Sequence, residues 1–331
     1  MKVIVAIVPH FQGVADAGRF ADLLGPGFDV VGLDADVGAH GGSHLADAEA
    51  ILSVFAPVTA AQAAAAPRLR LVQCTSHGFD HVDLDATAER GIAVCNVGTS
   101  GAEAHNVAEH TLLLMLALAK RLVEGHNGLI AGGWPGRELQ QLGMTELEGR
   151  TLGVVGLGMI GREVTRRAQA FGMRVVYSGR RRHAPDEEAA NGVEWRELDD
   201  LVAESDVVTL HVPLTRETRH LIDARRIALM KPTAFIVNTS RERLVDTDAL
   251  VDALEQGRLA GAGYDVFDPE PPPPGHRLVR APKVALSPHT AGATGESVAR
   301  ILEWAVANVR RLAAGEPLTD VVNGVSAPAR P

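Results

Sequence analysis

The chain has few of the features that mark secreted, membrane-spanning or nucleic-acid-binding proteins. Its 331 residues include only two cysteines, Cys74 and Cys95. Two cysteines make no disulfide framework, so we expect a reducing, cytoplasmic environment. The apolar runs 3–8 and 112–119 are too short for a signal peptide and for a membrane span respectively. A net charge of −9 argues against nucleic acid as a partner.

The chain does have the length and the apolar content of two domains, with 46% apolar residues. Strand-like runs alternate with helical segments in two sets. This alternation predicts an α/β protein with two doubly wound parallel sheets. The predicted strands are 3–8, 28–33, 50–55, 69–74 and 92–95, followed by 151–156, 173–177, 206–211, 234–238 and 260–264. The predicted helices are 15–24, 59–65, 104–123, 162–171 and 294–312.

A glycine-rich turn follows the first strand of the second set. It reads Gly156-Leu157-Gly158-Met159-Ile160-Gly161 and opens a helical pattern. A strand, a tight glycine turn and a helix in this order indicate a dinucleotide site. Gly156 permits the turn, Gly158 lets a pyrophosphate approach the backbone, and Gly161 lets the helix pack on the strand. The alternative is a tight turn in an α/β core that binds no ligand.

An acidic residue is missing where an NAD site usually has one. About 20 residues past the first glycine, an Asp or Glu normally binds the adenosine ribose 2′-hydroxyl. This chain has Ser178 and Gly179 there, followed by Arg180-Arg181-Arg182. Guanidinium groups and a hydroxyl bind a 2′-phosphate that a carboxylate would repel. We therefore predict that NADP(H) is preferred and that NAD(H) is the alternative cofactor. The competing interpretation is a solvated basic loop.

Three polar segments in the C-terminal half, 237–241, 264–271 and 286–290, follow strand-like runs. Ligands bind at such strand ends in open α/β sheets. Arg241 can grip a carboxylate and polarise a carbonyl. His289 can move the proton that accompanies a hydride, and a carboxylate such as Glu270 beside it would stabilise the imidazolium. Each residue also has a structural alternative. Arg241 can pair with Asp246 or Glu242, His289 can be an ordinary histidine, and Glu270 can decorate a proline loop.

The glycine turn lies in the middle of the chain, so the nucleotide domain is an insertion. We expect residues 1–102 and 290–331 to form a substrate-binding domain. Residues 103–289 are expected to form an NAD(P)-binding Rossmann domain. Two crossings between the domains would leave a cleft, where ligands tend to lie.

Residues 70–315 resemble the D-isomer-specific 2-hydroxyacid dehydrogenases. Residues 1–69 match this family only in pattern. The resemblance implies a flavodoxin-like substrate domain, an inserted Rossmann domain, and a homodimer built largely from the nucleotide domains. The matching segments are 107–110, 149–153, 156–161, 206–215, 230–232 and the three polar segments.

The resemblance assigns roles to individual residues. Arg241 matches the substrate-binding arginine, His289 the acid/base, and Glu270 its carboxylate partner. Ser76-His77-Gly78 matches the loop whose backbone amides bind the substrate carboxylate, and Asp265 matches an acid near the nicotinamide. Gly179-Arg180 is similar to the NADPH-using glyoxylate/hydroxypyruvate reductase branch. The remaining cofactor positions are Leu157, Met159, Ile160, Ser178, Arg181, Val212, Pro213, Thr218 and Thr239.

Three departures from the family pattern bear on the substrate. Glu242 replaces a glycine after the arginine. His77 stands where many relatives have a small or apolar residue and where the phosphite-oxidising branch has a lysine. Glu270 replaces the glutamine of the formate-oxidising branch, which disfavours formate. Trp134 either reaches across the dimer or is a buried structural residue.

We therefore predict an NADPH-preferring 2-oxo acid reductase that adds a hydride to C2. The alternatives are a phosphite dehydrogenase-like enzyme and a non-catalytic, nucleotide-sensing protein that resembles transcriptional corepressors. We predict no metal site, no nucleic acid and no membrane partner.

Overall fold

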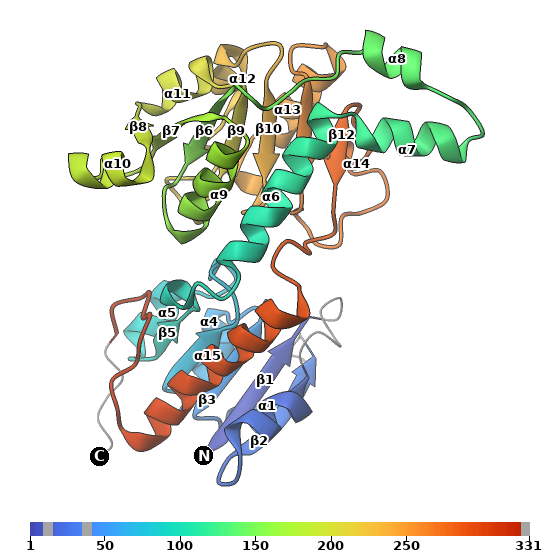
Figure 1. Ribbon diagram of the computed structural model, residues 1–331. Coiled ribbons are helices and arrows are strands. Elements are labelled where there is room, and N and C mark those ends of the chain that lie inside the picture. The colour runs from blue at the N-terminus through green and yellow to red at the C-terminus, as the bar shows by residue number, and fades with distance from the viewer. Residues whose placement is uncertain (9–15, 35–41, 326–331) are drawn as a thin grey trace. The chain divides into compact units, whose positions relative to one another are not determined.

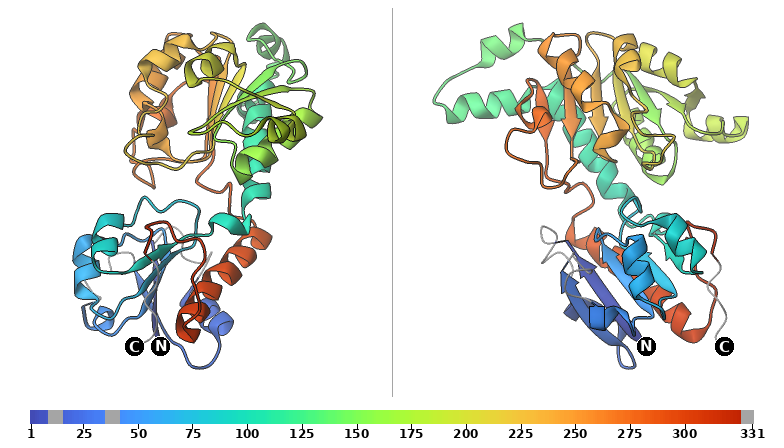
Figure 2. Two further views of the ribbon diagram at one scale, coloured as in Figure 1. Left: turned by 90° about the vertical axis from the view of Figure 1, so that its left-hand side faces the viewer. Right: turned by 180° about the vertical axis from the view of Figure 1, so that it is seen from behind.

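The computed structural model describes residues 1–8, 16–34 and 42–325, and it is shown in Figures 1 and 2. Its contacts divide the chain into two compact units. Unit 1 consists of Met1–Glu103 and Ala293–Pro331, and unit 2 is Ala104–Gly292. The described residues of each unit form one all-parallel sheet, which confirms the predicted fold class of two doubly wound domains.

The sheet of unit 1 has the strand order β2-β1-β3-β4-β5, which is the flavodoxin-like order. Successive side chains of a strand point to opposite faces. Val3 and Val5 therefore pack against α15 and α1, whereas Ile4 and Ala6 pack toward α3 and α4. The strands are β1 Lys2–Ile7, β2 Asp29–Asp34, β3 Ala50–Val54, β4 Leu71–Cys74 and β5 Ala93–Cys95. The helices are α1 Ala17–Leu24, α3 Gly42–Leu45, α4 Ala60–Ala65, α5 Leu84–Glu89, η2 Gly98–Ser100 and α15 Gly295–Ala314.

The sheet of unit 2 has the strand order β12-β11-β10-β9-β6-β7-β8, a Rossmann order with one added edge strand. Helices α6 and α9 cover one face, and α11, α12 and α13 cover the other. The strands are β6 Thr151–Val155, β7 Arg174–Ser178, β8 Val193–Trp195, β9 Val207–Leu210, β10 Phe235–Asn238, β11 Gly261–Tyr264 and β12 Val284–Leu286. The helices are α6 Ala104–Ala119, α7 Leu122–Ile130, α8 Gly136–Gln141, α9 Met159–Ala170, α10 Pro185–Asn191, α11 Leu198–Glu204, α12 Ala224–Leu229, η3 Glu242–Leu244, α13 Thr247–Glu255 and α14 Arg277–Arg280.

The helix predicted over 104–123 is shorter in the structure. It ends at Ala119, and Arg121 has a φ of 54°, in the left-handed region that a continuous helix excludes. A second helix, α7, begins at Leu122. The predicted first helix included residue 15, which lies outside the described residues, and α1 begins at Ala17. Throughout the described part of the chain, every helix is too short or too polar to cross a membrane.

Candidate active site

The glycine turn lies between β6 and α9, where the strand order of the unit 2 sheet reverses. Gly156 has a φ of 97°, and a Cβ there would lie 2.6 Å from the His211 carbonyl oxygen. A Cβ at Gly161 would overlap the Gly156 carbonyl oxygen. Both positions therefore require glycine for the turn to close. At Gly158, by contrast, a Cβ would meet none of the described atoms within 4 Å.

The geometry of this turn suits an anionic ligand. Gly158 is the N-cap of α9 and provides no side chain to occupy the first amides of the helix. These amides and the helix dipole favour a negative charge. The side chain of Leu157 packs into the core and that of Ile160 packs against it, whereas Met159 is 37% exposed. The turn thus presents its backbone, and a dinucleotide pyrophosphate fits the open place at Gly158.

The three arginines after β7 differ in their contacts. Arg182 forks the Glu188 carboxylate through two hydrogen bonds of 2.8 Å, and Glu188 also accepts one from the Tyr177 hydroxyl. The bonds from Arg182 lower the pKa of Glu188 to about 2. Arg180 and Arg181 are exposed side chains. The loop therefore offers two guanidinium groups to solvent and uses the third to hold its own structure.

Other predicted cofactor residues follow β7, β9 and β10. Ser178 is the buried last residue of β7, and Gly179 comes directly after it. The Thr218 hydroxyl donates to the Pro213 carbonyl at 2.7 Å and so closes the loop after β9. A Cβ at Gly156 would lie 2.7 Å from Val212 Cγ1, so this side chain borders the glycine turn. The Thr239 hydroxyl lies 3.2 Å from the Thr111 hydroxyl of α6.

A carboxylate–histidine pair joins the loops after β11 and β12. Glu270 Oε2 lies 2.6 Å from His289 Nδ1, and Glu270 Oε1 accepts a 2.9 Å bond from the Phe267 amide. Burial alone would raise the pKa of Glu270. The bond and charge of His289, the Phe267 amide and the charge of Arg241 outweigh burial and lower this pKa below its usual value. Glu270 is therefore an ionised carboxylate in direct contact with the imidazole of His289.

Asp265 is fully buried and organises the loop that carries this histidine. Its Oδ1 accepts bonds from the Ser287 hydroxyl at 2.6 Å and the Thr290 amide at 2.9 Å, and its Oδ2 accepts one from the Ala291 amide at 2.8 Å. The Ser287 hydroxyl also lies 2.7 Å from His110 Nε2 on α6. The carboxylate of Asp265 thus binds the loop after β12 on both sides of His289.

Arg241 and Glu242 lie at the end of β10. Arg241 Nη1 donates to the Ser240 carbonyl at 2.8 Å. The Glu242 side chain is 5% exposed, and its carboxylate accepts bonds from the Asp268 amide at 2.7 Å and the Thr247 hydroxyl at 2.6 Å. Its Oε2 lies 3.4 Å from His276 Nε2. The acid that replaces the family glycine is therefore turned into unit 2, where it links two loops.

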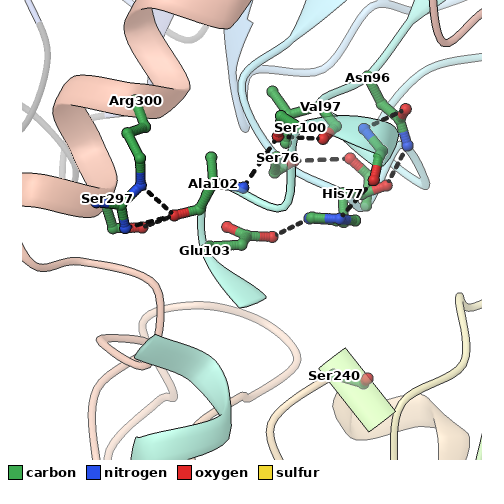
Figure 3. Close-up of polar contacts among 12 residues, drawn as sticks. Ser76, His77, Asn96, Val97, Ser100, Ala102, Glu103, Ser240, Ser297 and Arg300 are labelled. Atoms are coloured by element: carbon green, nitrogen blue, oxygen red, sulfur yellow. Dashed lines mark hydrogen bonds and ion pairs between the residues drawn. The ribbon is translucent and has the colours of Figure 1, made fainter. Parts of the chain in front are cut away.

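The predicted substrate loop of unit 1 follows β4, and Figure 3 shows it. The Ser76 hydroxyl donates to the Gly78 carbonyl at 2.7 Å, and Asn96 Nδ2 donates to the His77 carbonyl at 2.8 Å. His77 Nδ1 bonds the Glu103 carboxylate. These contacts fold the loop from within its own unit.

Several of these residues were not singled out by the sequence. Glu103 and His276 lie outside the three polar segments and carry no local signal. His110 ends the matching segment 107–110 but was given no role there. Ser287 lies two residues before His289 in the same polar segment. This proximity was the signal in the sequence that could have identified it as a site residue. The structure brings the predicted Glu270 and His289 together, as well as Asp265 and the histidine loop.

The Rossmann sheet with its glycine turn is typical of one class of proteins, those that bind a dinucleotide. Residues 112–291 match the family model described as D-isomer specific 2-hydroxyacid dehydrogenase, NAD binding domain. The chain belongs to the D-isomer specific 2-hydroxyacid dehydrogenase family. It is an NAD(P)-dependent oxidoreductase that acts on CH–OH groups, as predicted.

Individual relatives support this membership. The chain is 41% identical over 288 residues to a glyoxylate reductase of Korarchaeum cryptofilum, covering 86% of each chain. It is 43% identical over 263 residues to one of Aeropyrum pernix, covering 78% of this chain and 77% of the relative. Among solved structures, a glyoxylate reductase from Paecilomyes thermophila matches with a TM-score of 0.83 at 27% identity, over 99% and 98% of the two chains. An NAD-dependent formate dehydrogenase from Staphylococcus aureus, in complex with NAD, matches with a TM-score of 0.86 at 30% identity, over 97% and 99%.

Proposed function

We propose that the protein is an NADPH-preferring reductase of small 2-oxo acids, with glyoxylate and hydroxypyruvate as the first candidates. The observation that carries the proposal is the 2.6 Å contact between the ionised Glu270 and His289 Nδ1. This pair can keep a proton on the imidazole and release it to an oxygen. The relatives named glyoxylate reductase, at 41% and 43% identity, support the substrate class.

The proposed mechanism assigns one task to each polar group. The amides of His77 and Gly78 bind the substrate carboxylate, and the Arg241 guanidinium binds that carboxylate and the keto oxygen. When bound, the reduced nicotinamide supplies the hydride that C2 accepts. Nε2 of His289 gives its proton to the developing alkoxide, since Glu270 holds Nδ1. The 2-hydroxy acid leaves, and the imidazole takes up a new proton from solvent.

The preference for NADPH rests on the loop after β7. Ser178 contributes a hydroxyl, Gly179 stands where a carboxylate would repel a 2′-phosphate, and Arg180 and Arg181 are exposed. Arg182 is engaged with Glu188 and so neutralises the acid of α10 that lies beside this loop. We expect the 2′-phosphate to bind Ser178, Arg180 and Arg181.

We also propose a homodimer that uses the apolar surface of α7 and the segments around it. Trp134 is 87% exposed, Ile130 75% and Leu122 58%. The alternative that Trp134 is a buried structural residue of its own chain is therefore wrong. Contiguous exposed apolar side chains mark protein–protein interaction sites, and we expect this segment to form one.

The test is oxidation of NADPH and NADH with glyoxylate, hydroxypyruvate, pyruvate and phenylpyruvate in parallel. Faster turnover with NADPH than with NADH would support both the reaction and the role of the arginines, and the best substrate would define the specificity. Phosphite with NADP⁺ is run as a separate assay. Turnover only with phosphite, or tight NADPH binding without any turnover, would overturn the proposed activity in favour of phosphite oxidation or nucleotide sensing.

A further inference from the structure

The imidazole of His77 lies between two hydrogen-bond acceptors. Its Nδ1 bonds the Glu103 carboxylate, and its Nε2 lies 3.2 Å from the Gly98 carbonyl oxygen. Figure 3 shows the ring and the Glu103 carboxylate directed toward each other. A neutral imidazole has one N–H and one lone pair, so it satisfies only one such acceptor. The imidazolium has two N–H groups and satisfies both.

We propose that His77 is an imidazolium that positions the substrate loop Ser76–Gly78 by donating to Glu103 and Gly98 together. This inference rests on the proposed role of that loop in binding the substrate carboxylate. The ring does not bind the substrate itself, because both of its nitrogens are engaged within unit 1. His77 is a positioning residue, and the groups that bind the substrate are the loop amides.

The contacts around the ring show how it fixes the loop. The His77 carbonyl accepts a 2.8 Å bond from Asn96 Nδ2, and Asn96 Oδ1 accepts one of 2.9 Å from the Gly98 amide. Gly98 is therefore held by both of its backbone groups, since its amide bonds Asn96 and its carbonyl bonds the His77 ring. Glu103 is itself at a fixed point of the chain, since the carbonyl of Ala102 beside it accepts bonds from the Arg300 guanidinium. The loop therefore has one defined shape while the ring carries two protons.

The charges near the ring favour the protonated state. Burial alone would lower the pKa of His77, but the bond and charge of Glu103, the Gly98 carbonyl and the charge of Asp320 raise it above its usual value. Asp320 comes from the C-terminal segment, where it accepts bonds from the Thr99 amide and the Trp304 indole. Arg300 on α15 is engaged by the Ala102 carbonyl, which accepts a 2.8 Å bond from its guanidinium.

This assignment has a consequence for the charge of the substrate. The imidazolium and the Glu103 carboxylate neutralise each other, so the loop adds no net positive charge to the site. Its amides then suit a singly charged 2-oxo monocarboxylate better than a doubly charged anion such as phosphite. His77 thereby differs from a lysine at the same position, whose ammonium would face the substrate as a point charge.

The first experiment measures the protonation of the ring directly. We would record ¹⁵N NMR spectra of the full chain labelled in histidine at pH 7 and assign His77 by its absence in His77→Gln. The expected result is a pair of similar ring-nitrogen shifts, as an imidazolium gives. Two widely separated shifts, as a neutral ring gives, would overturn the proposal whatever the enzymatic activity is.

The second experiment compares the KM for the oxo acid in His77→Gln and in the wild type from pH 6 to pH 10. The KM ratio is the readout, because any pH effect that arises outside the His77 contacts is the same in both proteins and cancels. At low pH we expect the KM of His77→Gln to be about tenfold above that of the wild type, because the variant loses one charged hydrogen bond. The ratio should fall toward one as the pH rises and His77 of the wild type loses its proton. The kcat ratio should stay near one. A KM ratio that does not change with pH would overturn the proposal.

Two further variants separate positioning from a general loss of structure. Glu103→Gln keeps an acceptor for the ring but removes its charge, so His77 should lose its proton at a lower pH. The KM of this variant should therefore begin to rise at a pH about 1 unit or more below that at which the KM of the wild type rises. His105→Gln is the matched control, since the His105 side chain is 60% exposed and its Nδ1 lies 3.1 Å from the Glu163 carboxylate of α9. The KM of this variant should equal that of the wild type. If the wild-type protein does not reduce 2-oxo acids, the proposed function is overturned. The NMR spectra still decide the charge of His77 in that case, so the failure of one proposal can be distinguished from the failure of the other.

Discussion

Glu242 accepts a 2.7 Å hydrogen bond from the backbone amide of Asp268. This contact joins the loop that follows β10 to the loop that follows β11. The first loop carries Arg241 immediately before Glu242, and the second carries Glu270 two residues after Asp268. An ion pair between Arg243 and Asp268 connects the same two loops. Glu242, a residue that the family pattern does not include, thus links the loop of Arg241, the proposed substrate-binding residue, to the loop of Glu270, the proposed partner of the acid/base.

Replacing Glu242 by glycine, the usual family residue, should lower both stability and turnover. The variant leaves the Asp268 amide and the Thr247 hydroxyl without their acceptor, at a cost of about 1–3 kcal/mol in the free energy of unfolding. We expect kcat to fall several-fold because the loop before Glu270 relaxes. Urea unfolding and steady-state kinetics measure the two effects. Glu242→Gln keeps an acceptor and should lose less of both, and equal losses in the two variants would contradict the proposed link.

His289→Ala should reduce kcat by about 10²–10⁴-fold, the usual contribution of a general acid. The Kd for NADPH should stay unchanged, because the histidine lies outside the glycine turn. Stopped-flow turnover and fluorescence titration with NADPH provide the two measurements. A variant that retains near-native turnover would exclude His289 as the proton donor.

Glu270→Gln should move the alkaline limit of kcat to lower pH. The pKa of Glu270 in the folded protein is lowered. Its contribution to the free energy of unfolding is therefore complete above the pKa of the unfolded chain, about 4.3, and is lost as the pH falls through the pKa of the folded protein. Glu270 is therefore ionised across the assay range from pH 6 to pH 10, and the shift in the variant reports the lost charge beside the imidazole. The pH–kcat profile measures it, and superimposable profiles would argue against a functional pair.

Two glycines of the turn should respond differently to alanine. Gly161→Ala places a Cβ against the Gly156 carbonyl oxygen, so we expect a loss of stability of about 1–3 kcal/mol from overpacking. Gly158→Ala places a Cβ in open space, so the protein should fold normally and bind the cofactor weakly if the pyrophosphate occupies that place. Thermal unfolding and cofactor titration separate the two effects. Normal cofactor affinity in Gly158→Ala would place the pyrophosphate elsewhere.

The arginines after β7 provide a matched set for the cofactor. The double variant Arg180→Ala/Arg181→Ala should raise the KM for NADPH about tenfold or more and leave the KM for NADH unchanged, because charge-assisted bonds to a 2′-phosphate are lost. Arg182→Ala should instead leave the buried Glu188 with Tyr177 alone and affect both cofactors together. Equal effects of the double variant on NADPH and NADH would contradict the predicted preference.

The sequence predicted the fold well where the pattern is local. Apolar runs of four or more residues marked the inner strands, and the glycines of the turn fixed the boundary between β6 and α9. The strands β8 and β12 have only three residues each, and neither lies in an apolar run of four as β5 does, so the sequence did not indicate them. An arginine, Arg121, adopts the left-handed conformation at the break between α6 and α7. Without a glycine or proline at that position, the sequence did not indicate that the helix ends there.

Of the contacts at the candidate site, the sequence predicted the pair of Glu270 and His289 but not the contacts of His77 and Glu242. Glu270 and His289 were identified from their chemistry and from the family resemblance. The partners of His77 and Glu242 lie 26 residues away in both cases, at Glu103 and Asp268. Tertiary folding sets such contacts, and neither spacing nor residue type indicates them. For the same reason, the family resemblance placed Asp265 beside the nicotinamide but did not show that its carboxylate binds the amides of the histidine loop.

The discontinuity of unit 1 has a consequence for how the protein is made. The apolar face formed by β1 and β3 is covered by α15, which lies beyond the whole of unit 2 in the chain. At about 5–20 residues per second, a ribosome needs on the order of 10–40 s to synthesise the stretch between them. Unit 2 is continuous and can complete its core as it emerges. Until α15 is made, one face of the unit 1 sheet is covered only by α1. A nascent chain of this protein therefore exposes the apolar surface of its N-terminal segment to chaperones for longer than that of unit 2.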